Sequence, residues 1–260
     1  MLAVMTGKIT EETDLAVRIR HAESYPFARP ACSYLFEGGA MRPLPKGACH
    51  GRLPVIASGS NASPDRLAAK FGIGDVIPVT RAVLEGFAVV FAGHFTAYGA
   101  MPATLCPHQD ASTTVWLTWL TSAQLSVMHQ SEGVIGCREA EQRYDYAMLE
   151  GLDLHFEKEL PITEAGAYLS RRMFAPHGRP MRFAEVLSGC CGLEAASQSA
   201  ALRHAAALLY SSGAGFAGFM AKVLSSVEQR QALFQALTPY TIERGSAWPD
   251  GRLPILPIAV

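Results

Sequence analysis

One acidic residue of this sequence stands where a carboxyl group could transfer protons. Glu132 is followed by Gly133 and comes just past a predicted helix, which itself follows an apolar strand. Shielding by Trp116, Trp119 and Met128 would raise the pKa of the Glu132 carboxyl group towards the range useful for proton transfer. The alternative interpretation is a solvated glutamate at a helix end, because most glutamates lie at protein surfaces.

A second stretch carries backbone groups that could hold an oxygen atom of a ligand. This stretch is the turn Ser58-Gly59-Ser60-Asn61. Its small side chains leave several N–H groups facing outward, so it can bind a carboxylate or a carbonyl oxygen close to the backbone. The alternative interpretation is a plain connection between a strand and a helix.

The residues on either side of this turn predict the elements that hold it. Val55-Ile56 predicts a short buried strand before the turn. After it, Ser63 is expected to cap a helix through its hydroxyl, and Pro64 suits the first helical position. Gly72 is expected to end that helix after Phe71.

The region between this helix and Glu132 predicts mostly strands. Residues 76–79 form a short apolar run, and residues 82–91 indicate a bend at Gly86 followed by a buried strand. Residues 103–107 and 113–120 predict two further strands, with a turn at residues 108–111 between them. Thr121 and Gln124 fit a capping box that starts the helix leading to Glu132. One more strand is expected at residues 144–149, which include Tyr144 and Tyr146.

The two flanks of the chain have different patterns. The N-terminal flank predicts a helix at residues 9–20 and an edge strand at residues 33–36. It also holds a cluster of basic or near-basic residues, read either as a solvated face or as a gate over an anionic substrate: Arg18, Arg20, His21 and Arg29. From residue 160 onward the pattern predicts helices, at residues 163–173, 182–187, 193–211, 219–224 and 227–237. A tail at residues 248–260 is expected to be extended.

Composition narrows the function classes. The chain has 260 residues, of which 49% are hydrophobic and 17% charged, and its formal net charge is −1. This balance is typical of a globular protein and gives no electrostatic reason to expect a nucleic-acid partner. The N-terminus is too short and too soon polar for a signal peptide, and no apolar run would span a bilayer. A soluble, cytoplasmic protein with reduced thiols is therefore expected.

Several common kinds of site are not supported by the motifs. The chain has no G-x-x-x-x-G-K-[ST] and no G-x-S-x-G sequence, so a nucleotide held by a P-loop, or a serine triad, is not expected. A structural zinc site would need four ligands in two close pairs. The potential ligands are scattered instead, at His94, Cys106, His108, His129, Cys190 and Cys191. We therefore predict no metal and no cofactor.

Taken in order, five pieces of the sequence resemble the γ-glutamylcyclotransferase-like superfamily over about residues 53–150. The turn at 58–61 resembles the family's Y-G-S-N loop, and residues 82–91 resemble its A-x-L-x-G-[YF]-x-x-x-F strand. Thr104-Leu105-Cys106-Pro107 matches a T-L-x-P strand, and the Glu132-Gly133 pair follows a strand and a helix as in the family. A tyrosine then follows, matched by Tyr144 or Tyr146.

This resemblance implies both a fold and a reaction. The expected fold is α+β, a small mixed β-barrel with surrounding helices. The implied reaction cyclises a γ-glutamyl amide to 5-oxoproline and releases an amine, without a metal. Glu132 would be the acid/base, and the substrate-binding residues would be Ser58, Gly59, Ser60, Asn61, Tyr144 and Tyr146. The expected ligand is a small γ-glutamyl amide or another amino-acid-like molecule.

The sequence departs from the family pattern at two sites. Ser58 stands where the family's loop has a tyrosine, and Trp116-Leu117-Thr118 replaces a common glycine in the strand before the helix. We therefore keep a second hypothesis, a non-catalytic module that binds a small ligand or a partner on the same barrel. The predicted organisation is an irregular lead-in at 1–52, the barrel domain at 53–158 and a helical extension at 159–260. This extension could cover the barrel mouth, form a homodimer surface or bind a partner.

Overall fold

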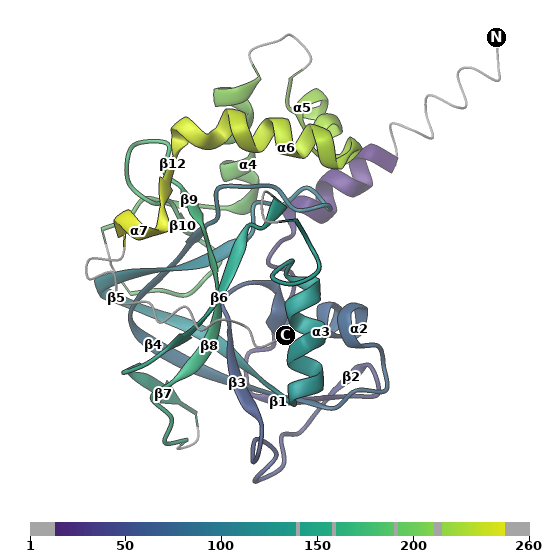
Figure 1. Cartoon of the computed structure of the whole chain (residues 1–260), viewed down its shortest axis with the longest axis vertical. Helices are drawn as coiled ribbons and strands as arrows, with labels where there is room; N and C mark the ends of the chain where they lie inside the picture. Colours follow the sequence, from purple (N-terminus) through teal and green to yellow (C-terminus); the bar gives the residue numbers. More distant parts are fainter. Residues whose placement is uncertain (1–13, 139–140, 158–159, 190–191, 211–214, 248–260) are drawn as a thin grey trace, which may run out of the picture.

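The computed structural model describes residues 14–138, 141–157, 160–189, 192–210 and 215–247. Its fold is mixed α+β, with one large sheet and helices around it (Figure 1). A helix over residues 14–23 comes first. The strands are β1 (Tyr34–Glu37), β2 (Ala40–Arg42), β3 (Leu53–Ala57), β4 (Ile77–Phe91), β5 (Ala103–Leu120), β6 (Tyr144–Leu149), β7 (Leu154–Phe156), β8 (Ala165–Ser170), β9 (Arg172–Phe174), β10 (Arg182–Phe183), β11 (Ala195–Ala196) and β12 (Thr241–Glu243). The helices are η1 (Ser60–Ala62), α2 (Pro64–Phe71), α3 (Ser122–Ser131), α4 (Gln198–Leu209), α5 (Gly215–Ser225), α6 (Val227–Leu237), η3 (Thr238–Tyr240) and α7 (Arg244–Ala247).

The main sheet has the order β11-β10-β4-β5-β3-β8-β6, and β1 and β7 also pair with β4. It is a mixed sheet, because β3 runs parallel to β8 while its other neighbour, β5, is antiparallel. The strand predicted from Val55-Ile56 is β3, and the strand predicted at 144–149 is β6. The N-terminal strand expected at 33–36 is β1, which pairs with β4.

The long pair formed by β4 and β5 unites segments that the sequence had suggested as separate strands. Residues 77–79 and 82–91 belong to β4, and residues 103–120 are one strand, β5. The bend expected at Gly86 is a register shift between Glu85 and Phe87, where Gly86 has φ +78°. The predicted turn at 108–111 lies within β5, opposite this shift, and its residues have no register partner on β4.

The prediction of helices from residue 160 onward is wrong for its first part. Residues 163–173, expected to be helical, form strands β8 and β9, and β10 replaces the helix expected at 182–187. Every residue of β8 is buried, so its sequence shows no polar alternation that would distinguish a strand from a buried helix. Because β8 lies between β3 and β6, the C-terminal region contributes directly to the main sheet.

The later helices agree better with the prediction. Three of them, α4, α5 and α6, contact one another and gather at one end of the molecule, at the top of Figure 1. The helix predicted at 227–237 is α6, and the Ser226 hydroxyl caps it by accepting from the Gln229 N–H at 3.2 Å. None of the helices in the described part of the chain is long and apolar enough to span a membrane. The expected extended tail at 248–260 lies outside the described residues.

Candidate active site

A cavity of about 390 Å³ opens between the end of β3, the C-terminal end of α3 and the start of β6. The residues that the sequence singled out and that line it are Ser58, Gly59, Ser60, Asn61, Glu132 and Tyr144. These residues come from three separate parts of the chain, and the sheet brings them together. The structure thus unites the turn, the acid and one of the two tyrosines around one space.

The turn that follows β3 is shaped by the packing of Tyr25. A Cβ atom at Gly59 would lie 2.1 Å from the Tyr25 hydroxyl oxygen, so only glycine leaves room for this contact. The Tyr25 hydroxyl also accepts a hydrogen bond from the Ala103 N–H at 2.9 Å, which fixes the ring against β5. After Gly59 the chain forms the short helix η1 and then α2. The turn is therefore held from behind by a side chain of the N-terminal segment.

Two local expectations about the start of α2 have different outcomes. Pro64 occupies the beginning of the helix, and Gly72 ends it with φ +80°, as predicted. Ser63 is the N-cap residue, but its hydroxyl makes no capping hydrogen bond. Its backbone N–H instead donates to the Ser60 carbonyl at 2.9 Å, because η1 already turns the chain before α2 starts.

Glu132 is placed by the helix that precedes it. The predicted capping box is present at the start of α3, where the Thr121 hydroxyl accepts from the Gln124 N–H and the Gln124 side chain accepts from the Thr121 N–H. At the other end of α3, Glu132 is the C-cap residue, with φ −90° and ψ 0°. The length of α3 therefore decides that the Glu132 carboxylate reaches the cavity beside the turn.

The Glu132 carboxylate is bound by one group from α2 and one from the turn at 58–61. Its Oε1 atom accepts a hydrogen bond from Asn61 Nδ2 at 3.0 Å and forms an ion pair with the Lys70 ammonium group. The side chains of Glu132 and Lys70 are 17% and 7% exposed. Within the described residues, no hydrogen bond reaches the second oxygen, Oε2. One oxygen is thus fixed, and the other is left for a ligand.

The prediction of a raised pKa for Glu132 is wrong. Burial on its own raises the pKa of this carboxyl group, but the Lys70 charge, the hydrogen bonds from Lys70 and Asn61, and the Arg66 charge outweigh it, so the pKa is lowered. The expected shield differs as well. Trp116 and Trp119 do not line the cavity, and Met128 contacts Lys70, with its sulfur 3.4 Å from Nζ.

The two predicted tyrosines differ in position. Tyr144 lines the cavity and donates its hydroxyl to the Ala103 carbonyl at 3.1 Å. Tyr146 is two residues further along β6 and packs against His129 and Tyr168, with ring centres 4.6 and 5.2 Å away, outside the cavity lining. Tyr168 from β8 lines the cavity instead, and its hydroxyl is hydrogen-bonded to His129 Nδ1 at 2.8 Å.

Cationic and neutral polar groups complete the lining, and sequence reasoning missed them. Arg66 lies over the Tyr98 ring at 5.1 Å, and its buried Nε atom has no hydrogen-bond partner among the described residues. Burial, with a smaller contribution from the Arg143 charge, lowers the pKa of His94 to about 3, so its imidazole is neutral at physiological pH. The spacing of Arg66 and Lys70, four residues apart in the helix after the turn, was a signal that could have placed both on one helix face.

These groups place an anion and two cations around one cavity. The Glu132 carboxylate is paired with Lys70, and Arg66 is a second cation of the lining. Burial raises the pKa of Tyr25 and Tyr144, so both hydroxyls stay protonated, and Tyr144 donates its proton to the Ala103 carbonyl. In the part of the chain that the structure describes, no group of three or more His, Cys, Asp or Glu side chains could hold a metal ion.

Comparisons with known proteins give little further information. No protein-family model matches this chain, and no curated protein matches it. Among solved structures, the chain is similar to the solution structure of At5g39720.1 from Arabidopsis thaliana. The identity is 16%, the TM-score is 0.34, and the match covers 45% of this chain and 68% of that chain.

Proposed function

We propose that this chain is a γ-glutamylcyclotransferase-like enzyme that cyclises a γ-glutamyl amide to 5-oxoproline and releases an amine. The observation that carries this proposal is the shared cavity of Glu132 and the turn at 58–61, joined by the hydrogen bond between Asn61 and Glu132. The family's small mixed barrel with surrounding helices is part of the same proposal. The reaction needs no metal or cofactor, and the ligand is a small amino-acid-like amide.

The proposed reaction moves protons from the substrate's α-ammonium group to its leaving nitrogen. Glu132 takes a proton from the ammonium group, and the freed amine attacks the γ-carbonyl carbon and closes the ring. The tetrahedral carbon then carries an oxyanion, which N–H groups of the turn stabilise. Glu132 passes two of the three ammonium protons to the leaving nitrogen while the bond between that nitrogen and the γ-carbonyl carbon breaks. The third proton stays on the substrate nitrogen as the lactam N–H.

The surroundings of Glu132 suit the first of these steps. Because Lys70 lowers the pKa of Glu132, the carboxylate is ionised at neutral pH and can accept a proton. Its Oε2 atom is the one to which the substrate ammonium group would bind, since Oε1 already accepts from Asn61 and Lys70. Ring closure is intramolecular, so a ligand held in the cavity has already lost most of the entropy that the step would cost.

One observation favours a second candidate, a module that binds an amino-acid-like ligand without turning it over. The Lys70–Glu132 ion pair makes Glu132 a weaker base than a buried carboxylate without a cation nearby. An ion pair of this kind also serves to brace α2 against the end of α3. Binding without chemistry would use the same cavity and the same charges.

The test is the release of 5-oxoproline from a panel of γ-glutamyl amines and γ-glutamyl dipeptides. We compare the wild type with Glu132→Gln and with the control Glu164→Gln, which alters an exposed glutamate just before β8. We expect release by the wild type and the control, and a loss of about 100-fold or more in Glu132→Gln.

A further variant removes both charges, Lys70→Met with Glu132→Gln, so that no buried ammonium group loses its partner. Release that survives in Glu132→Gln and in the double variant would remove Glu132 from its proposed role. Saturable binding of these ligands without release by the wild type would favour the binding module. The cytoplasmic location and the homodimer remain predictions from the sequence.

A further inference from the structure

A second cavity, of about 490 Å³, shares Tyr25 with the candidate active site. Tyr25 lines both cavities, and the second is bounded by the segment that follows it in the chain and by the β4–β5 pair. Of the residues that line the first cavity, only Tyr25 also lines the second. This cavity therefore needs its own explanation.

Two buried donors at this cavity have no acceptor. They are the Nη1 group of Arg29 and the indole Nε1–H of Trp116, neither of which has a hydrogen-bond partner within the described residues. The Trp116 residue is only 6% exposed, so its N–H has lost water without gaining a protein partner. Such donors are costly to bury, and a pair of them at one cavity indicates an acceptor that the protein itself does not supply.

The two side chains are also held together. The guanidinium carbon of Arg29 lies 4.9 Å from the centre of the Trp116 ring, and Arg29 Nη2 donates to the backbone carbonyl of Glu185 at 3.0 Å. The segment that carries Arg29 turns at Phe27, which has φ +66°, a conformation that residues with side chains rarely adopt. The position of the guanidinium group over the indole is thus built by the fold.

The other charged groups that line the cavity are engaged with different partners. The Glu185 carboxylate accepts from the Gln198 N–H at 2.9 Å, and Glu23 accepts from the Ser199 hydroxyl at 2.6 Å. Arg81 lies 3.4 Å from a Glu157 oxygen. Within the described residues, no carboxylate therefore accepts a hydrogen bond from Arg29, although its Nη1 atom is buried.

The remaining lining is mostly apolar and sets the shape of the occupant. It includes Pro26, Phe27, Pro30 and Leu187, of which Leu187 is 72% exposed and stands at the rim. A guanidinium N–H and an indole N–H together match the two oxygens of a carboxylate, and the apolar walls match an apolar body. A volume of about 490 Å³ is within the range of small-molecule sites.

We propose that this cavity is a second ligand site, which binds a small organic acid by its carboxylate through Arg29 and Trp116 and packs the acid's apolar body against Phe27 and the neighbouring prolines. The proposal does not depend on the activity of the first cavity. The carboxylate supplies the acceptor that both donors lack. Neutral molecules of the same shape offer no negative charge to Arg29 and bind more weakly.

The probe is benzoate, with benzamide as its neutral match, and binding is measured by calorimetry on the full-length protein. We expect saturable binding of benzoate and an affinity for benzamide at least about tenfold lower. Arg29→Gln and Trp116→Phe should each weaken benzoate binding by about tenfold or more, since each removes one of the two donors. The control is Arg42→Gln, which alters an exposed arginine outside the lining of both cavities and should leave benzoate binding unchanged.

Thermal unfolding of each variant shows whether it is folded. If Arg29→Gln does not fold, Arg29→Lys replaces it, because lysine keeps the positive charge but cannot present the same guanidinium N–H groups. Equal affinities for benzoate and benzamide, or benzoate binding that survives Arg29→Gln and Arg29→Lys unchanged, would overturn the proposal. Loss of benzoate binding in Arg66→Gln with Arg29→Gln unaffected would place the acid in the first cavity and also overturn it. If benzoate does not bind to the wild type at all, the proposal is also overturned, and water alone would satisfy the two donors.

Discussion

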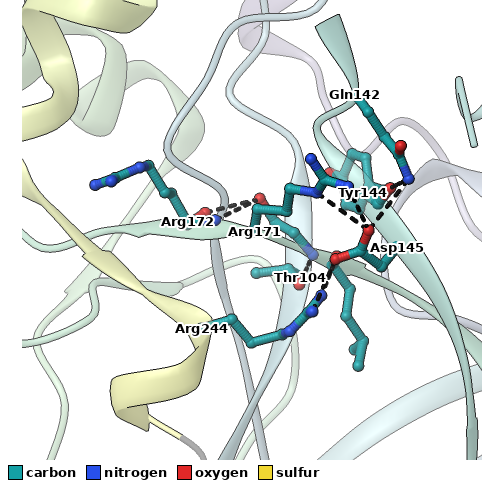
Figure 2. Close-up of polar contacts among 9 residues, drawn as sticks. Thr104, Gln142, Tyr144, Asp145, Arg171, Arg172 and Arg244 are labelled. Carbon is teal, nitrogen blue, oxygen red and sulfur yellow. Dashed lines mark hydrogen bonds and ion pairs between the residues drawn. The ribbon is translucent and has the colours of Figure 1, made fainter. Parts of the chain in front are cut away.

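Two buried carboxylates of this protein have similar exposure and very different surroundings. The side chain of Asp145 is 14% exposed and that of Glu132 is 17% exposed. Both oxygens of Asp145 are bound by arginines: Oδ1 accepts from Arg171 Nε and Nη2 at 3.1 and 2.9 Å, and Oδ2 accepts from Arg244 Nη2 at 2.8 Å. Figure 2 shows these groups converging on Asp145. Glu132 has a single ammonium partner and one oxygen that accepts no hydrogen bond within the described residues.

The difference separates a structural carboxylate from one available to a ligand. Asp145 on β6 joins Arg171, at the end of β8, to Arg244, at the start of α7, and Arg244 also donates to the Leu169 carbonyl at 3.1 Å. It therefore ties the C-terminal region to the main sheet. Glu132 joins two helices at a cavity, and half of its hydrogen-bonding capacity is unused there. Burial alone would not distinguish the two.

The largest expected effect is on folding, in Asp145→Ala. This change leaves two guanidinium groups without their shared acceptor. It should lower the free energy of unfolding by about 3 kcal/mol, mostly through the buried Arg244, because Arg171 is 39% exposed and can be solvated instead. Denaturant unfolding measures the loss, with Glu132→Gln alongside, for which we expect a smaller decrease. If the two variants lose equal stability, the proposed division between the carboxylates fails.

The next effect is on the ionisation of Glu132, in Lys70→Met. Without the ammonium group, burial dominates and the pKa of Glu132 should rise. The acidic limb of the pH profile for 5-oxoproline release, or for ligand binding, should move to higher pH. Lys46→Met is the control, because Lys46 is exposed and lies elsewhere. An unchanged profile would mean that Lys70 does not set the charge state of Glu132.

The pH dependence of stability gives a smaller effect with a definite sign. The pKa of Glu132 is lower in the folded protein than its ordinary value, so its contribution is present above the unfolded pKa and is lost as the pH falls through the folded pKa. The difference in unfolding free energy between wild type and Glu132→Gln should therefore shrink as the pH falls from neutral to acidic. A difference that grows on acidification would show that the pKa is raised instead.

The smallest effect is expected at the far end of α3, in Thr121→Ala. Loss of the capping hydrogen bond to Gln124 should cost about 1 kcal/mol of stability. Ser126→Ala serves as the control, because Ser126 lies in the exposed middle of the same helix and its hydroxyl only returns to the Ser122 carbonyl. Thermal unfolding separates the two variants. Equal melting temperatures would remove the capping box from the account of how Glu132 is placed.

Local patterns predicted the elements around the cavity. The capping box of Thr121 and Gln124, the strand before Gly59 and the helix after it each depend on a few neighbouring residues, so the sequence was sufficient for them. The order of motifs also predicted that the turn and Glu132 lie at one pocket, and both line the same cavity. These features need no knowledge of how distant segments pack.

The errors concern contacts between distant segments. Lys70 changes the sign of the expected pKa shift of Glu132, and it lies 62 residues away in the sequence. Tyr144 and Tyr146 share one face of β6 by the alternation of a strand, but the cavity reaches only the first of them. Strand β8 was predicted as a helix because both of its faces are buried, so its sequence has no polar alternation. The close packing of the Tyr146 ring on Gly166 of this strand is a contact that local sequence does not reveal.

The most direct test of this account is a carbon-13 NMR titration of the Glu132 side-chain carboxyl carbon, assigned by comparison with Glu132→Gln. The account predicts a pKa below the ordinary glutamate value in the free protein, and a change of this resonance when 5-oxoproline or a γ-glutamyl amide is added at neutral pH. An ordinary or raised pKa, together with a resonance that does not respond to either ligand, would contradict it.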